Sequence, residues 1–161
     1  MWYVQKSYFC AMQKLNFPDY SFRFKNSENK PAIFDCIRKK FIVLTPEEWV
    51  RQHVVCFLLE QKKYPKSHIN VEKIIKINGL TKRYDVVVFK PDGKILVLVE
   101  CKAPEVPISQ NTFDQIARYN LTVDAEYMMV TNGLNHYFCQ MDQEAEKYIF
   151  LRDLPEYTPA L

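Results

Sequence analysis

Residues 83–102 contain two apolar runs separated by an Asp-Gly pair, and this stretch constrains the fold more than any other. The first run is Val86-Val87-Val88-Phe89 and the second is Ile95-Leu96-Val97-Leu98-Val99. Both are rich in aliphatic residues and are apolar on both faces, as in strands that are buried on both sides of a sheet. Asp92-Gly93 favours a two-residue hairpin loop. We therefore predict an antiparallel hairpin in the interior of a sheet.

The charged ends of this hairpin are predicted to face one another. With a two-residue loop, Pro91 lies opposite Lys94 and paired residue numbers sum to 185. Asp85 then lies opposite Glu100, with Cβ atoms about 4.5–5.5 Å apart, and Lys102 shares the face of Glu100. Two such carboxylates repel, so we expect compensation by a proton, by Lys102 or by a bound cation. The alternative is that these charges are only the solvated ends of two strands, and a slip of one residue would separate the carboxylates.

A second hairpin extends the row of carboxylates to a third strand. An apolar-rich strand at 69–77 precedes Asn78-Gly79, another favoured two-residue loop. Paired numbers then sum to 157, which puts Glu72 opposite Asp85. Three carboxylates on adjacent strands predict a site for a hard divalent cation, Mg²⁺ or Mn²⁺. The alternative for Glu72 is an ion pair with Lys102 or Arg83.

Capping signals predict a helix before these strands. Thr45-Pro46-Glu47-Glu48 offers a capping threonine, a proline at the first helical position and a capping-box glutamate. Apolar residues at helical spacing continue to about residue 62. On this interpretation Glu48 is explained as a cap, and His53, which lies in the apolar face, is a core residue.

A second helix and a further strand follow the Glu-x-Lys sequence. Thr112-Phe113-Asp114-Gln115 predicts a cap and a helix that ends at Asn120. Gln115 and Tyr119 share one face of this helix because they are four residues apart. The strand at 127–130 comes after a helical crossover, so it can pair in parallel with the preceding strand.

The flanking segments are predicted to be β-rich. Residues 20–44 indicate a small β unit that starts with a strand at 20–25, and residues 136–140 and 147–151 indicate a closing hairpin. The basic run Arg38-Lys39-Lys40 is either a nucleic-acid contact or a solvated face. Residues 1–11 are an extension or precede an alternative start at Met12.

Composition sets broad limits. A chain of 161 residues with 48% apolar and 25% charged residues is typical of one globular domain. Its five cysteines are widely spread, which favours reduced thiols over zinc and a cytoplasmic location. No apolar run approaches the ~20 residues of a membrane span, and the start lacks the features of a signal peptide. The net charge of +3 permits nucleic-acid binding without requiring it.

Asp85, Glu100-x-Lys102 and Gln115-x-x-x-Tyr119, on a helix–three strands–helix–strand order, resemble the PD-(D/E)XK nuclease superfamily. The stretch from Thr45 to Gly133 is similar to the N-terminal domain of type I restriction enzyme R subunits, in its short stand-alone form. The most specific pieces are Val99-Glu100-Cys101-Lys102-Ala103-Pro104 and Phe113-Asp114-Gln115-Ile116-Ala117-Arg118-Tyr119-Asn120.

This resemblance implies an α/β (α+β) fold with a restriction-endonuclease-like αβββαβ core and a central mixed sheet. The expected divisions are an N-terminal extension with the small β unit at 1–44, a nuclease-like domain at 45–155 and a tail at 156–161. It also implies Mg²⁺ or Mn²⁺ bound by Asp85, Glu100 and the backbone carbonyl of Cys101. Glu72 and Glu48 are further candidate ligands.

The remaining roles implied by the resemblance belong to three side chains. Lys102 would orient the attacking water and lower its pKa, and Gln115 and Tyr119 would steady Lys102 or the DNA backbone. The implied function is a metal-dependent endodeoxyribonuclease of restriction-modification type, with DNA as partner. The alternative is a non-cleaving nucleic-acid-binding or accessory module that joins a separate motor or specificity subunit.

Two features depart from the family pattern. Tyr84 stands where the superfamily pattern has proline, at a position that varies. The sequence also contains no Gly-Lys-Ser/Thr phosphate loop, whereas R subunits continue into an ATP-driven motor. We therefore expect that this chain does not translocate DNA by itself.

Overall fold

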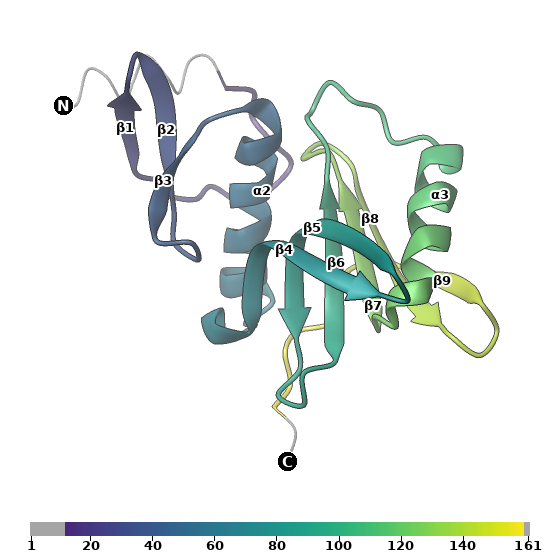
Figure 1. The fold of residues 1–161 in the computed structure, drawn as a ribbon. Coiled ribbons are helices and arrows are strands. Elements are labelled where there is room, and N and C mark those ends of the chain that lie inside the picture. Colours follow the sequence, from purple (N-terminus) through teal and green to yellow (C-terminus); the bar gives the residue numbers. More distant parts are fainter. Residues whose placement is uncertain (1–11, 160–161) are drawn as a thin grey trace.

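The computed structural model describes residues 12–159, in which two sheets and two α-helices are arranged as in Figure 1. The prediction that residues 1–11 form an extension lies outside this range. The elements are β1 (Phe24–Ser27), β2 (Lys30–Asp35), β3 (Lys40–Val43), α2 (Pro46–Cys56), β4 (Ile69–Ile77), β5 (Leu80–Phe89), β6 (Ile95–Cys101), α3 (Gln110–Asn120), β7 (Tyr127–Thr131), β8 (His136–Asp142) and β9 (Lys147–Leu151). Short helical turns cover Phe57–Gln61, Lys66–His68 and Leu121–Val123. None of the helices between residues 12 and 159 is long and apolar enough to cross a membrane.

The large sheet has the order β4-β5-β6-β7-β8-β9, and its strands are antiparallel except for the parallel pair β6 and β7. Helix α3 provides the crossover that parallel pairing requires. From α2 onward, the order is helix, three strands, helix and strand, followed by a closing hairpin of β8 and β9. The predicted α+β fold with a central mixed sheet is therefore confirmed.

The hairpin of β4 and β5 has the predicted register. Ile77 pairs with Leu80 and Lys73 pairs with Tyr84, so paired numbers sum to 157. Asn78 and Gly79 form the two-residue loop, with φ angles of 49° and 78°. Both angles are positive, as the favoured hairpin turn requires at its two central residues.

The loop between β5 and β6 differs from the prediction, although the register of the strands does not. Val86 pairs with Val99 and Val88 with Val97, on the predicted sum of 185, but Phe89 pairs with Ile95. The amide of Lys90 donates to the carbonyl of Lys94 at 2.7 Å, so the loop contains three residues, not two. The register shift next to Val88 offsets the longer loop, because a bulge adds one residue to one strand.

The interior strands bury both of their faces, as the unbroken apolar runs predict. Val86, Val88, Val97 and Val99 belong to a core that includes Val50 and Val54 of α2. On the other face, residues of α3 pack on β7 and β8, with Phe113 and Ala117 against Met128 and Val130. The sheet is thus covered by α2 on one face and by α3 on the other (Figure 1).

The start of one helix follows the prediction and the start of the other does not. Thr45 caps α2, since its Oγ1 accepts a hydrogen bond from the amide of Glu48 at 3.1 Å. Helix α3 begins at Gln110 and not at Thr112, because Ser109 is the N-cap and its Oγ accepts from the amide of Thr112. Thr112 therefore lies inside the first turn.

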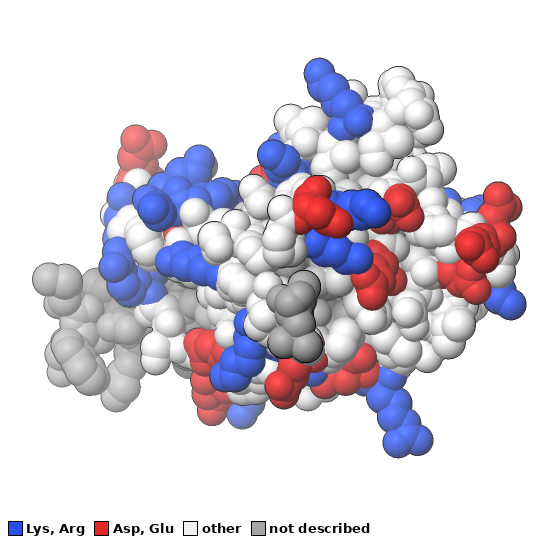
Figure 2. All heavy atoms as spheres, turned by 90° about the horizontal axis from the view of Figure 1, so that it is seen from below, with Lys and Arg blue, Asp and Glu red and all other residues white. Residues whose placement is uncertain are grey.

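The small β unit is a three-stranded antiparallel sheet, β1-β2-β3. Its first strand starts at Phe24, so the predicted strand at 20–25 is wrong in its bounds. Tyr20 and Phe22 instead direct their rings toward His53 of α2, with centroid distances of 5.8 and 4.8 Å. Lys and Arg side chains gather on the side of the molecule where this unit lies (left in Figure 2).

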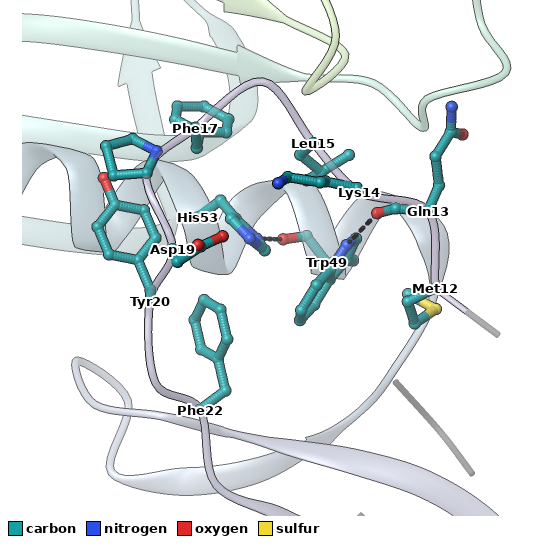
Figure 3. A pocket seen from close by; sticks show the side chains of 11 residues that line it. Met12, Gln13, Lys14, Leu15, Phe17, Asp19, Tyr20, Phe22, Trp49 and His53 are labelled. Carbon is teal, nitrogen blue, oxygen red and sulfur yellow. Dashed lines mark hydrogen bonds between the residues drawn. The ribbon is translucent and has the colours of Figure 1, made fainter. Parts of the chain in front are cut away.

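Residues 12–22 run across the outer face of α2 and, together with Trp49 and His53, line an open pocket of about 420 Å³ (Figure 3). The indole Nε1 of Trp49 donates to the carbonyl of Gln13 at 3.0 Å. Leu15 lies so close to Gly133 that a Cβ atom there would stand 2.8 Å from its side chain. This pocket contains none of the site residues predicted from the sequence.

Two histidines contact this segment and make the fold sensitive to acid: His53 is buried and packs against Phe17, and His136 is half-buried. His53 Nδ1 lies 2.9 Å from the carbonyl of Trp49, and His136 Nε2 lies 2.6 Å from that of Asn16. Burial lowers the pKa of both imidazoles. As the pH falls below about 6.5, the unfolded chain takes up these protons first, so the stability of the folded state decreases.

We therefore expect the free energy of unfolding to fall between pH 7 and pH 5, by about 1.4 kcal/mol for each unit of pKa depression. Urea denaturation at several pH values measures this change. In His53→Gln the dependence on pH should be smaller than in the wild type. An unchanged slope in that variant would contradict the assignment to His53.

Candidate metal centre

Asp85 lies where β5 meets the end of β6. The ladder pair Val86–Val99 places Asp85 and Glu100 at the next position along the two strands. The amide of Cys101 donates to Asp85 Oδ2 at 2.8 Å, which fixes the carboxylate beside β6. Only 15% of the Asp85 side chain is exposed.

The main partner of Asp85 is a residue that the sequence did not single out, Arg51 of α2. Its Nη2 lies 2.8 Å from Asp85, 2.9 Å from Glu72 and 3.1 Å from Glu47. Its Nη1 pairs with Glu48. Four carboxylates therefore surround one guanidinium, whose side chain is 6% exposed. Burial, followed by the charge of Asp85, raises the pKa of Glu47.

Glu48, in the first turn of α2, has a role beyond helix capping. Its amide is capped by Thr45, as predicted, but its carboxylate is directed toward charged and polar side chains. Arg38 Nη2 lies 2.6 Å from it and Gln52 Nε2 donates to it at 2.8 Å. Capping is therefore not the full explanation of this buried glutamate, because its side chain also joins Arg38 to Arg51.

Glu72 occupies an irregular position in β4, with φ at 57°. Its carboxylate pairs with Arg83 Nε at 2.9 Å as well as with Arg51. The ion pair with Arg83, which was the alternative considered from the sequence, is confirmed. Through Arg51, Glu72 is also joined to Asp85.

Glu100 has a different cation. Lys82 Nζ lies 2.5 Å from its carboxylate and also lies over the rings of Tyr84 and Tyr119, at 4.7 and 4.5 Å. Burial raises the pKa of Glu100, and Lys82 acts in the opposite direction. Asp85 thus turns toward α2 while Glu100 turns toward Lys82 beside α3. Regular strand alternation predicted that the two carboxylates would share one face.

Lys102 lies beside the same carboxylates, and within residues 12–159 its ammonium has no carboxylate within 4 Å. Its amide donates to the carbonyl of Thr131 at 2.8 Å, which continues the pairing of β6 with β7. Its positive charge lowers the pKa of Glu47 and of Glu100, against the larger effect of burial. The ammonium of Lys102 is therefore available to contact a bound ligand at the end of the sheet where Asp85 and Glu100 lie.

Gln115 and Tyr119 lie on α3, as the sequence predicts, and both are exposed. Tyr119 contacts the ammonium of Lys82, the partner of Glu100. Among the residues from 12 to 159, the side chain of Gln115 makes no hydrogen bond. Their proposed support of Lys102 or of DNA stays a prediction.

Carboxylate oxygens are suitable ligands for a hard cation, but these carboxylates are not arranged around a common point where a cation could bind. No group of three or more His, Cys, Asp or Glu side chains in the described part of the chain could hold a metal ion as they stand. Asp85 and Glu100 nevertheless supply the oxygen ligands that Mg²⁺ prefers. Their present partners are cationic, so metal binding requires the carboxylates to exchange Arg51 and Lys82 for the ion.

Arg51 and Lys82 could have been found from the sequence only in part. Arg51 follows Glu47 by four residues and Glu48 by three, which is the spacing of helical ion pairs. Lys82 and Tyr84 are two residues apart on a strand, so they share a face. The contacts of these cations with Asp85 and Glu100 depend on how the elements pack in space.

Comparison with known proteins gives a solved structure and a family that are similar to this chain. One solved structure that resembles it is a fragment described as an HsdR subunit of a type I restriction enzyme from Vibrio vulnificus YJ016, with 19% identity and a TM-score of 0.48. The match covers 70% of this chain and 24% of that chain, so this chain spans about a quarter of its relative. No curated protein matches. The family described as type I restriction enzyme R protein N terminus matches residues 46–155, and the chain belongs to this family.

Proposed function

We propose that this protein is a metal-dependent endodeoxyribonuclease that hydrolyses DNA phosphodiester bonds. The observation that carries the proposal is the convergence of five carboxylates around Asp85, of which Glu48 and Glu100 are buried. Four carboxylates share one guanidinium, Arg51, and a fifth, Glu100, lies at the adjacent position of β6. Membership of a restriction-enzyme family supports a nuclease-like role.

The metal would be Mg²⁺ or Mn²⁺, held by Asp85, Glu100 and the backbone carbonyl of Cys101. Glu72 and Glu48 are further candidate ligands because both form ion pairs with Arg51, which also pairs with Asp85. When bound, the ion would polarise the scissile phosphate and lower the pKa of a water molecule.

Lys102 would position the attacking water beside the metal. The water would lose a proton to solvent and attack phosphorus as hydroxide, the bond from phosphorus to the 3′ oxygen would break, and the 3′ oxygen would take up a proton from solvent. The products are a 5′-phosphate and a 3′-hydroxyl. Gln115 and Tyr119, both exposed on α3, would contact Lys102 or the DNA backbone during this step.

The proposal includes a change of partners at both principal ligands. Asp85 must leave Arg51, and Glu100 must leave Lys82. The partner of the whole site would be DNA, with a separate motor or specificity subunit as a further candidate partner.

The second candidate function is a DNA-binding or accessory module that does not cut. The observation that favours it is that both principal carboxylates already have cationic partners, at 2.8 Å for Asp85 and 2.5 Å for Glu100. A module of this kind needs neither a metal nor the free ammonium of Lys102.

Nicking of supercoiled plasmid distinguishes the two functions. The wild type should nick in Mg²⁺ or Mn²⁺ and not in EDTA. Glu100→Gln should lose at least about a hundredfold in rate, since even the loss of an outer-shell partner of a metal site costs 10–100-fold. Glu144→Gln is the matched control, because Glu144 is exposed in the loop between β8 and β9.

Equal nicking by the wild type and Glu100→Gln would refute the proposed site. Tight, metal-independent DNA binding with no nicking under any of these conditions would establish the second function instead.

A further inference from the structure

The positive charge of this protein is concentrated in its small β unit. Residues 20–44 contain six basic and two acidic residues, whereas the rest of the chain contains one more acidic than basic residue. One of the two acids, Asp35, is fully buried in an ion pair with Arg38. The exposed surface of β1–β3 is therefore strongly cationic, and Lys and Arg gather on this side in Figure 2.

Cations on the outer face of this sheet are fixed by aromatic rings. The guanidinium of Arg23 lies 3.9 Å from the ring centroid of Phe34, and Lys25 Nζ lies 4.6 Å from that of Phe41. The two rings are cross-strand neighbours, 5.2 Å apart. Cation–π contacts of this kind orient the charged groups. Since cations cover the rings, the rings are poorly placed to stack on bases.

A rigid turn connects this face to the candidate metal centre. Asp35 Oδ1 accepts hydrogen bonds from the amides of Ile37 and Arg38, both at 2.8 Å, which shapes the turn between β2 and β3. The Arg38 side chain then bridges Asp35 to Glu48 of α2, at 2.5 and 2.6 Å. Lys39 and Lys40 follow directly and are exposed.

The contacts continue from this turn to the catalytic candidates. Glu48 pairs with Arg51, and Arg51 pairs with Asp85. The turn between β2 and β3 is therefore connected to Asp85 by three ion pairs in series, Arg38–Glu48, Glu48–Arg51 and Arg51–Asp85. A polyanion that approaches the carboxylates of the centre is repelled by them, so it needs cations nearby to hold it.

We propose that the outer face of β1–β3, together with the turn between β2 and β3, binds the phosphate backbone of the DNA that reaches Asp85. This surface is here termed the basic face and is formed by Arg23, Lys25, Lys30, Lys39 and Lys40. This inference rests on the proposed function for the identity of the substrate. Binding at the basic face is electrostatic and independent of base sequence, because the aromatic rings are covered and ammonium groups contact phosphates without reading bases.

The test compares two triple variants with equal loss of charge. Lys25→Gln/Lys39→Gln/Lys40→Gln removes part of the basic face. Lys63→Gln/Lys94→Gln/Lys147→Gln is the matched control, with three exposed lysines elsewhere. Each set includes one lysine at positive φ, Lys39 at 54° or Lys63 at 60°, so backbone effects are matched.

Fluorescence anisotropy with a short labelled duplex, in Ca²⁺ to avoid cleavage, gives the dissociation constant at several salt concentrations. Each lysine that contacts a phosphate contributes about 0.9 to the slope of log affinity against log salt. The slope of the basic-face variant should fall by up to about 2.7, and the control should keep the slope of the wild type. A scrambled duplex should bind equally well.

The outcomes separate this surface from the nuclease. If the slope of log affinity against log salt is smaller for the basic-face variant and the wild type does not nick DNA, DNA binding at the basic face is supported and the proposed nuclease function fails. Normal cleavage together with an unchanged slope in that variant overturns the surface while the proposed function stands. A strong preference for one sequence or for single strands, or no DNA binding by the wild type, also overturns it. Thermal unfolding confirms that both variants are folded.

Discussion

Replacement of Lys102 by Met is expected to reduce Mg²⁺-dependent plasmid nicking by about a hundredfold to ten-thousandfold, the range for a positioned group that assists proton transfer. Lys102 lies beside Glu47 and Glu100, and within residues 12–159 no ion pair occupies its ammonium. It can therefore act on a water molecule without first leaving a carboxylate. Initial rates of nicking at saturating Mg²⁺ measure the effect.

Binding of Mn²⁺ separates this role from ligation. Because Lys102 repels a cation, the Lys102→Met protein should bind Mn²⁺ as tightly as the wild type or slightly more tightly, as measured by titration calorimetry. Lys94→Met is the matched control, since Lys94 is exposed at the opposite end of β6. Undiminished nicking by Lys102→Met would exclude Lys102 from the chemistry. If Lys102→Met also lost affinity for Mn²⁺, Lys102 would be needed to keep the metal site formed and not for the chemical step itself.

The sequence predicted the fold well because its strongest signals are local. Apolar runs, two Gly-containing turns and a capped helix predict the order of elements, and the parallel pair follows from the helical crossover between β6 and β7. The loop at Asp92-Gly93 was predicted to be one residue too short. The register survived because both faces of β5 and β6 are buried, which favours the alignment that keeps every valine inside.

The candidate site was predicted less completely, for two physical reasons. The first is the irregular backbone at Glu72, where positive φ interrupts the alternation of side chains. Tyr84 and Val87 pack in one cluster although residues three apart in a regular strand lie on opposite faces. Asp85, which lies between them, consequently reaches α2 while Glu100 does not.

The second reason is that the partners of the carboxylates come from other elements. Arg51 is 34 residues from Asp85 and Lys82 is 18 residues from Glu100 in the sequence. Periodicity places each of these side chains on a face of its own helix or strand. It does not say which face of α2 meets which strand, so the sequence did not predict that Arg51 and Lys82 pair with the two carboxylates.

Replacement of Arg51 by Met is expected to lower the free energy of unfolding by about 3–5 kcal/mol, the cost of leaving a buried ion pair without one partner. The physical reason is the group of carboxylates that Arg51 holds together. Without its charge, Asp85, Glu72, Glu48 and Glu47 repel one another in a partly buried position. Urea denaturation of the two proteins in metal-free buffer measures the difference.

A divalent cation should restore much of this loss, and that result ties Arg51 to the metal centre. If Arg51 stands where a cation can bind, then Mn²⁺ or Ca²⁺ should stabilise the Arg51→Met protein more than the wild type, because a ligand that binds only the folded state raises its stability. Arg83→Met is the control. Arg83 also pairs with Glu72, but its side chain is 66% exposed, so its loss should cost less than about 1 kcal/mol and should not alter the response to metal. Equal stabilisation of all three proteins by metal would show that these carboxylates do not form the cation site.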